Sequence, residues 1–123
     1  MLPGVGAYST AMKLLNELNF IEPLEKANKR KASLMGICLG MQIMADLGFE
    51  FGKTKGLGLL EAEVKPILCE DKIPHMGFNK ISIKTFNALL SGIEDEEFYF
   101  MHSYEMVNYT DVAALTKYLS LIH

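Results

Sequence analysis

The sequence predicts an α/β fold in which an open, mixed and partly parallel sheet is flanked by helices. In the first half of the chain, two stretches with helical spacing precede a short apolar stretch, a glycine-flanked turn and a third helical stretch. After Gly48, short β-branched or aromatic stretches alternate with glycine-containing turns, which is typical of strands. No linker, repeat or low-complexity segment interrupts the 123 residues, so we expect one domain over residues 1–123.

Two helices are expected before residue 32. Apolar side chains recur at helical spacing between Thr10 and Leu18, and Ser9 or Thr10 is placed to cap the helix start. The stretch IEPLEKANKRK, residues 21–31, has proline in its first turn, an acidic residue ahead of it and basic residues at its end, as the helix dipole favours. Its basic run is therefore interpreted as a solvated helix end and not as a nucleic-acid patch.

A strand, a sharp turn and a helix are expected around Cys38. The stretch ASLMGI, residues 32–37, predicts a short buried strand, and GMQIMADLG, residues 40–48, predicts a helix. Between them, Gly36-Ile-Cys38-Leu-Gly40 matches the G-x-S-x-G nucleophile elbow with cysteine in place of serine. The glycines permit a strained turn, and the helix start favours the reactive thiolate. The alternative interpretation is a buried structural cysteine at a strand end.

The second half of the chain predicts several strands. The candidates are EAEVKPI at residues 61–67, KISI at residues 80–83 and FYFMHSYEMV at residues 98–107.

Composition and charge exclude several functions. The net charge is −3 with both signs interspersed, so neither nucleic acid nor an anionic membrane surface is an expected partner. No apolar run approaches the roughly 20 residues that span a bilayer, and no signal peptide is recognised, so we expect a cytoplasmic protein. The two cysteines are interpreted as thiols in a reducing compartment. The cysteines and histidines lack zinc-ligand spacing, and GVGAYS lacks most of the dinucleotide fingerprint, so no metal and no cofactor is expected.

Five stretches carry a family resemblance: LPGVGAYSTAMKLL, GICLGMQ, GLGLL, IPHMGFN and FYFMHSYE, in that order. From residue 2 to about residue 118, the chain resembles the glutaminase subunits of imidazole glycerol phosphate synthase, a branch of the class I glutamine amidotransferases. The resemblance implies that Cys38 attacks the side-chain amide of L-glutamine, forms a thioester and releases ammonia. The ammonia would pass to a cyclase subunit of barrel fold, with which the glutaminase forms a heterodimer in histidine biosynthesis.

The resemblance also implies roles for individual residues. The oxyanion would be stabilised by the backbone N–H of Leu39 and by one from the PGVG loop, at Val5 or Gly6. The residues implied to hold glutamine are Gly6, Gln42, Tyr99, His102, Ser103 and Tyr104. Those implied to face the cyclase are Pro74, His75, Met76, Phe78 and Asn79. Without the resemblance, Gln42 is a helix-surface amide, His102 a strand histidine with satisfied hydrogen bonds, and PHMGFN a turn whose Met76 and Phe78 pack inside.

The chain departs from the family pattern in two ways. Phe78 stands where the family has tryptophan, so a relative that supplies ammonia for surface-sugar biosynthesis is an alternative, as is a catalytically inert scaffold subunit. The family's first strands would precede Leu2, and its catalytic histidine and glutamate would follow His123. The resemblance therefore implies an incomplete domain that is inactive alone. The ending LSLIH, residues 119–123, is similar to a translated sequencing-library transposon end, so we predict that it is not native.

Overall fold

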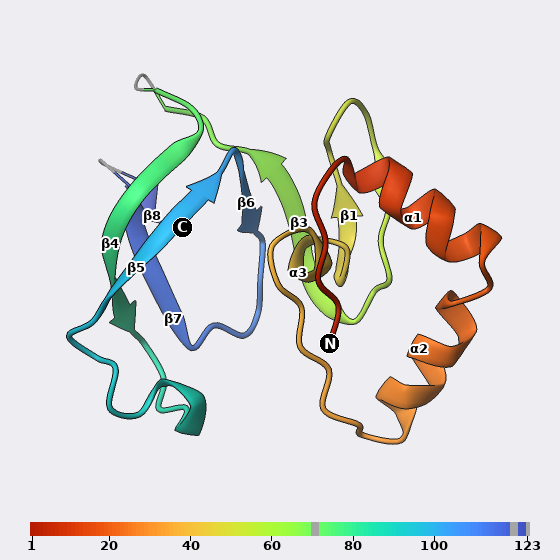
Figure 1. The fold of residues 1–123 in the computed structure, drawn as a ribbon, viewed down its shortest axis with the longest axis horizontal. Helices are drawn as coiled ribbons and strands as arrows, with labels where there is room; N and C mark the ends of the chain where they lie inside the picture. The colour runs from red at the N-terminus through yellow and green to blue at the C-terminus, as the bar shows by residue number, and fades with distance from the viewer. Residues whose placement is uncertain (70–71, 119–120, 123) are drawn as a thin grey trace. The chain divides into compact units, whose positions relative to one another are not determined.

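The computed structural model describes residues 1–69, 72–118 and 121–122. The chain forms two compact units, residues 1–65 with 106–109 and residues 66–105 with 110–123. Each unit contains strands, and together they hold two four-stranded sheets where the sequence predicted one mixed sheet. The α/β fold class with open sheets and flanking helices is confirmed, and all three α-helices belong to the first unit (Figure 1).

The helix α1, Tyr8–Glu17, opens the first unit (Figure 1). It begins two residues earlier than predicted, and its N-cap residue is Ala7, so the assignment of Ser9 or Thr10 as the cap is wrong. The carboxylate of Glu50 instead accepts a hydrogen bond from the Tyr8 N–H at 2.6 Å. An anion at this position also interacts favourably with the positive end of the helix dipole.

The buried face of α1 also differs from the prediction. Tyr8 and Met12 are buried, whereas Leu14 and Leu18, which were assigned to the apolar face, are exposed. Helical periodicity identifies the helix correctly, but the burial of each side depends on segments that are distant in sequence.

The helix α2, Ile21–Lys29, follows the predicted pattern. Glu22 lies in its first turn, Lys26 and Lys29 lie in its last turn, and Lys26 pairs with Glu22 at 2.6 Å. The basic run therefore ends a helix, as expected from the dipole.

The third helix, α3, is much shorter than predicted. It comprises Leu39–Gln42, and the strand β1, Ala45–Gly48, occupies the region where the helix was expected to continue. β1 pairs in parallel with β3, Leu60–Pro66, and antiparallel with β2, Thr54–Lys55. These ladder hydrogen bonds outweigh a helical preference that rests on only a few apolar residues.

The sheet of the first unit has the strand order β2-β1-β3-β6, where β6 is Tyr104–Val107. It is mixed, as predicted. The strand expected at residues 32–37 is reduced to a single parallel bridge between Leu2 and Gly36. This bridge is closed by hydrogen bonds from Leu2 N to Met35 O at 2.7 Å and from Ile37 N to Leu2 O at 3.0 Å.

The second unit contains an antiparallel sheet with the order β5-β4-β7-β8. Its strands are β5, Glu97–His102; β4, His75–Ile83; β7, Ala114–Tyr118; and β8, Leu121–Ile122. A short 3₁₀ helix, η1, Ala88–Leu90, lies in the connection from β4 to β5. The predicted strand at residues 98–107 is two strands separated by a bend at Ser103, and PHMGFN lies mostly in β4 and not in a turn.

Each unit has its own buried residues. In the first unit, the largest group follows the elbow through β1 and continues into β3: Leu39, Ile43, Met44, Ala45, Ala62 and Val64. In the second unit, Ile67, His75 and Thr116 are buried. Among the described residues, no helix has the length and apolar character needed to cross a bilayer. The predicted non-native ending falls largely outside the described residues, which here include only the backbone of β8.

Candidate active site

Cys38 lies at the turn between the bridged segment and α3. Its backbone has φ 55° and ψ −121°, a conformation that costs a non-glycine residue of order 1–3 kcal/mol. The residue is exposed, so the alternative of a buried structural cysteine is wrong. The carbonyl of Cys38 accepts hydrogen bonds from the N–H groups of Met41 at 3.0 Å and Gln42 at 3.1 Å. A strained, accessible thiol at a helix start is the arrangement of a nucleophile elbow.

The two glycines of the motif are required by close backbone approaches. A Cβ at Gly40 would overlap the carbonyl oxygen of Leu2, and a Cβ at Gly36 would lie 2.5 Å from the Cα of Met41. The parallel bridge from Leu2 to Gly36 runs beside this turn. The elbow is therefore held against the start of the chain by contacts that a side chain would prevent.

The PGVG loop lies beside the elbow within the first unit. A Cβ added to Gly4 would be 3.5 Å from the Cβ of Leu39, which places the two segments in van der Waals reach. Among the described residues, the backbone N–H groups of Val5, Gly6 and Leu39 have no hydrogen-bond partner. Backbone N–H groups near a nucleophile are the donors that stabilise an oxyanion. The structure thus brings Gly4 of the PGVG loop beside Leu39, the residue after Cys38, and the oxyanion role of Val5, Gly6 and Leu39 stays a prediction.

Gln42 occupies the last position of α3, four residues after Cys38, and is half-buried. It is therefore not a fully solvated helix-surface amide. Cys69, the other thiol, is half-buried and belongs to the second unit.

The remaining residues that the sequence assigned to glutamine lie in the second unit. His102 ends β5, Ser103 forms a bend and Tyr104 begins β6; we call these residues the 102–104 bend. The carbonyl of Ser103 accepts a hydrogen bond from Ile67 N at 2.9 Å. The His102 ring has partners at both nitrogens: Nδ1 lies 2.9 Å from the Tyr104 carbonyl oxygen and Nε2 lies 2.9 Å from Nδ1 of His75.

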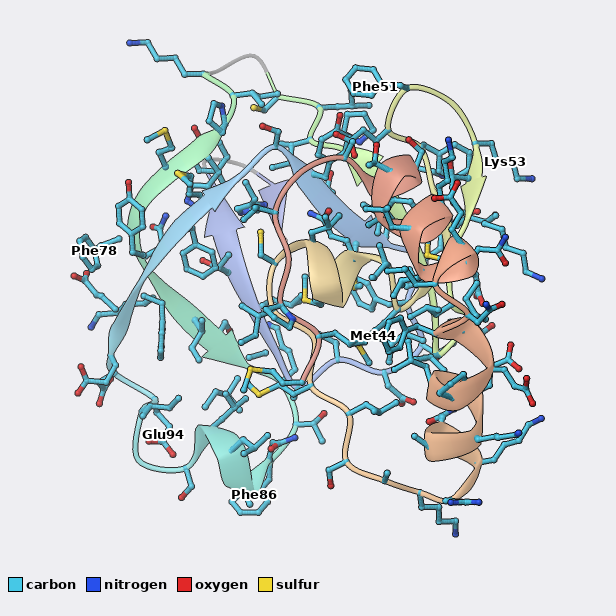
Figure 2. The ribbon with its side chains drawn as sticks, turned by 45° about the vertical axis from the view of Figure 1, so that its right-hand side comes forward. Met44, Phe51, Lys53, Phe78, Phe86 and Glu94 are labelled. Atoms are coloured by element: carbon cyan, nitrogen blue, oxygen red, sulfur yellow. The ribbon has the colours of Figure 1, made fainter. Side chains whose placement is uncertain are left out.

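Tyr99 does not share a face of the sheet with His102. Side chains alternate along β5, and Tyr99 lies opposite Phe78 of β4, with ring centroids 5.3 Å apart. Phe78 and Tyr99 are 67% and 55% exposed, and Figure 2 shows Phe78 projecting away from β4. Met76 and Met101 face each other two positions along, on the same face of the sheet, and are also exposed. The alternative that Met76 and Phe78 pack inside a turn is therefore wrong.

The residues assigned to the cyclase-facing segment differ in exposure. Pro74, Met76 and Phe78 are exposed, Asn79 is half-buried and His75 is 0% exposed. The side-chain nitrogen of Asn79 lies 2.7 Å from Nε2 of His75.

The sequence reasoning missed two features of the first unit. The Glu50 carboxylate accepts a hydrogen bond from the first N–H of α1, which begins two residues after Gly6. The only sequence signal for this contact is an acidic residue in a glycine-flanked loop. Tyr8 is buried with no hydrogen-bond partner for its hydroxyl among the described residues. Burial, with a smaller contribution from the charge of Asp46, raises the pKa of Tyr8 to about 12.

Comparisons with known proteins identify the family of the chain. The family described as glutamine amidotransferase class-I matches residues 1–120. Three relatives carry the name imidazole glycerol phosphate synthase subunit HisH or HisH 1. The Lactococcus lactis protein is 42% identical over 106 residues, covering 85% of this chain and 52% of the relative. The Aquifex aeolicus protein is 39% identical over 118 residues, covering 95% of this chain and 57% of the relative.

The third relative, from Campylobacter jejuni, is 47% identical over 109 residues, covering 85% of this chain and 54% of its own length. The chain thus spans about half the length of the curated relatives it matches. The resemblance that the sequence motifs carried is confirmed. The chain belongs to the class I glutamine amidotransferase family.

Proposed function

We propose that this protein is a glutaminase that hydrolyses L-glutamine through a thioester on Cys38 and supplies ammonia to a cyclase subunit of barrel fold in histidine biosynthesis. The observation that carries the proposal is the exposed thiol of Cys38 on a strained backbone, next to the N–H of Leu39, which has no hydrogen-bond partner among the described residues. The similarity to relatives that carry the name of the synthase subunit supports the choice of pathway.

The reaction follows from the geometry of the elbow. The Cys38 thiolate attacks the side-chain amide carbon of glutamine, and the carbonyl oxygen becomes an oxyanion within reach of the loop N–H groups. When this intermediate collapses, the C–N bond breaks, the nitrogen takes up a proton and ammonia leaves. Water then attacks the thioester, which gives glutamate and restores the thiol. Loss of one oxyanion donor typically lowers kcat about 10²–10³-fold.

Neither described histidine serves as the general base in this proposal. His75 and His102 each have partners at both ring nitrogens, so neither ring has a lone pair directed at a thiol. A positioned acid–base group contributes about 10²–10⁴-fold. We therefore expect the 123-residue chain, assayed alone, to show no turnover above a Cys38→Ala control.

We assign glutamine binding to Gly6, Gln42 and the 102–104 bend, the roles that the resemblance implied for them. Tyr99 was assigned to the same role, but its exposed position beside Phe78 favours a contact with the partner. Met76 and Phe78, with Met101 and Tyr99 opposite them, form an exposed apolar face on β4 and β5. An exposed apolar face of this kind suits a protein partner, and we assign it to the cyclase.

The test uses the protein expressed from its complete gene, with and without its cyclase subunit. Glutamate release should depend on Cys38 and be lost in Cys38→Ala, while Cys69→Ala keeps it. No glutamate release under either condition would support an inert scaffold instead.

One observation favours a second candidate, ammonia supply for surface-sugar biosynthesis. Phe78, on the face assigned to the partner, stands where the histidine-pathway family has tryptophan. Complementation of a histidine auxotroph that lacks this glutaminase separates the two. Failure of a well-expressed complete protein, supplied with its own cyclase, would favour the sugar pathway.

A further inference from the structure

A line of hydrogen bonds links β4 to the 102–104 bend inside the second unit. It runs from Asn79 Nδ2 to His75 Nε2 at 2.7 Å, from His75 Nδ1 to His102 Nε2 at 2.9 Å, and from His102 Nδ1 to the Tyr104 carbonyl oxygen at 2.9 Å. We propose that His75 and Asn79 are positioning residues that fix the 102–104 bend in its glutamine-binding shape through His102. The proposal rests on the proposed function and gives His75 and Asn79 a role inside the glutaminase, not at the partner surface.

The direction of every hydrogen bond follows from Asn79. An amide nitrogen only donates, so Nε2 of His75 must accept. A neutral imidazole then carries its proton on Nδ1, so His75 donates to Nε2 of His102. His102 in turn carries its proton on Nδ1 and donates to the Tyr104 carbonyl. Each printed donor thus meets one acceptor when the ring proton of both histidines lies on Nδ1.

His75 is held more firmly than a surface histidine. Its side chain is 0% exposed, and its ring stacks on Tyr118 at 3.9 Å and on Phe100 at 5.2 Å. His75 and His102 are direct partners in the β4–β5 ladder, so the backbone fixes the spacing of the two rings. A buried ring with fixed neighbours is able to orient a second ring, because it has little rotational freedom of its own.

The 102–104 bend is thereby fixed at two points. The His102 ring forms a hydrogen bond with the carbonyl of Tyr104, two residues later, and the Ile67 N–H donates a hydrogen bond to the Ser103 carbonyl. The backbone of Ser103 therefore has a defined orientation within the bend. Without the donor from His75, the His102 ring loses the hydrogen bond that orients its Nε2, and the hydrogen bond that closes the bend is weakened.

The experiment separates hydrogen bonding from packing at position 75. His75→Asn places an amide N–H near the position of Nδ1 and keeps the donor to His102, but it removes the stacked ring. His75→Phe keeps a stacked ring and removes the donor. Thr116→Val is the matched control, because it removes another buried hydrogen bond of the same unit, from Thr116 Oγ1 to Lys80 O at 3.1 Å.

The first readout is the histidine tautomer, measured by long-range ¹H–¹⁵N spectra of the 123-residue chain above the usual pKa of histidine. Both His75 and His102 should carry their proton on Nδ1, and Asn79→Leu should shift His75 away from that state. A proton on Nε2 of either histidine in the unsubstituted chain would overturn the proposed line of hydrogen bonds. This readout does not require glutaminase activity.

The second readout is glutamine hydrolysis by the protein expressed from its complete gene, in complex with its cyclase. His75→Phe and Asn79→Leu should raise KM for glutamine about five- to tenfold with kcat nearly unchanged, the effect of losing one hydrogen bond that orients the binding segment. His75→Asn should restore most of the lost affinity, and Thr116→Val should leave KM unchanged.

The outcomes distinguish this proposal from the function on which it rests. A wild-type complex without glutaminase activity would refute the proposed function, and the tautomer spectra would still test the relay. An active complex in which His75→Phe keeps the wild-type KM while His75→Asn raises it would show that the ring only packs. Equal KM changes in His75→Phe and Thr116→Val would show general destabilisation and would also overturn the proposal.

Discussion

Tyr8→Phe removes a single oxygen from the core of the first unit. The Tyr8 ring lies over Gly48, its hydroxyl is directed at Gly56, and the hydroxyl has no partner among the described residues. A buried polar group without a hydrogen bond costs about 1–3 kcal/mol. We expect Tyr8→Phe to raise the free energy of unfolding at neutral pH by about 1 kcal/mol, because phenylalanine keeps the ring and removes the unsatisfied hydroxyl.

The same variant has a second effect at alkaline pH. Burial raises the pKa of Tyr8 to about 12 from the usual 10.0 of a tyrosine, so the unfolded chain ionises first as pH rises. Ionisation of Tyr8 therefore leaves the free energy of unfolding unchanged below pH 10 and lowers it between pH 10 and about 12. Two units of pKa correspond to about 2.7 kcal/mol in total, of which about 1.4 kcal/mol is lost by pH 11. Tyr8→Phe lacks this loss.

The measurement is urea unfolding of both proteins at several pH values from neutral to about 11. Tyr109→Phe, the same change at a surface tyrosine of the first unit, is the control for general effects of removing a phenol. The gap between Tyr8→Phe and the unsubstituted chain should widen above pH 10, whereas the control should run parallel. A constant gap, or a loss of stability at neutral pH, would show that the hydroxyl has a partner in solution and would refute the reasoning.

Three further results are expected. Gly40→Ala should lower the free energy of unfolding by about 1–3 kcal/mol and abolish glutaminase activity, because the new Cβ overlaps the Leu2 carbonyl. Gly4→Ala is the stability control, because a Cβ there has ordinary contacts. Equal losses of stability in the two variants would contradict the requirement for glycine at position 40. A glutamine-analogue electrophile should label Cys38 in preference to Cys69, as checked by peptide mapping of the complete protein. Preferential labelling of Cys69 would assign the nucleophile to that residue instead. In the 123-residue chain, any turnover above Cys38→Ala that disappears in His102→Ala would identify His102 as the base and contradict its role in the relay.

Short-range patterns predicted the features that depend on neighbouring residues. The nucleophile elbow follows from two glycines around Cys38, since the turn that they permit is local. The helix α2 follows from Pro23 and its charge order, because the dipole acts within a single turn of each end. Alternation located most of β3 and β5, since successive side chains point to opposite faces of any strand.

Tertiary structure decided the features that depend on pairing across the chain. The segment at residues 45–48 became β1 and not a helix, because β2 and β3 supply its hydrogen bonds. Glu50 caps α1 from 42 positions away, and His75 meets His102 across 27 positions, distances at which a sequence pattern carries no information about contact. Sequence by itself therefore determined the family and the turn at Cys38. The tertiary structure determined which histidines are engaged and which helix face is buried, because burial and hydrogen bonding depend on segments brought together only by folding.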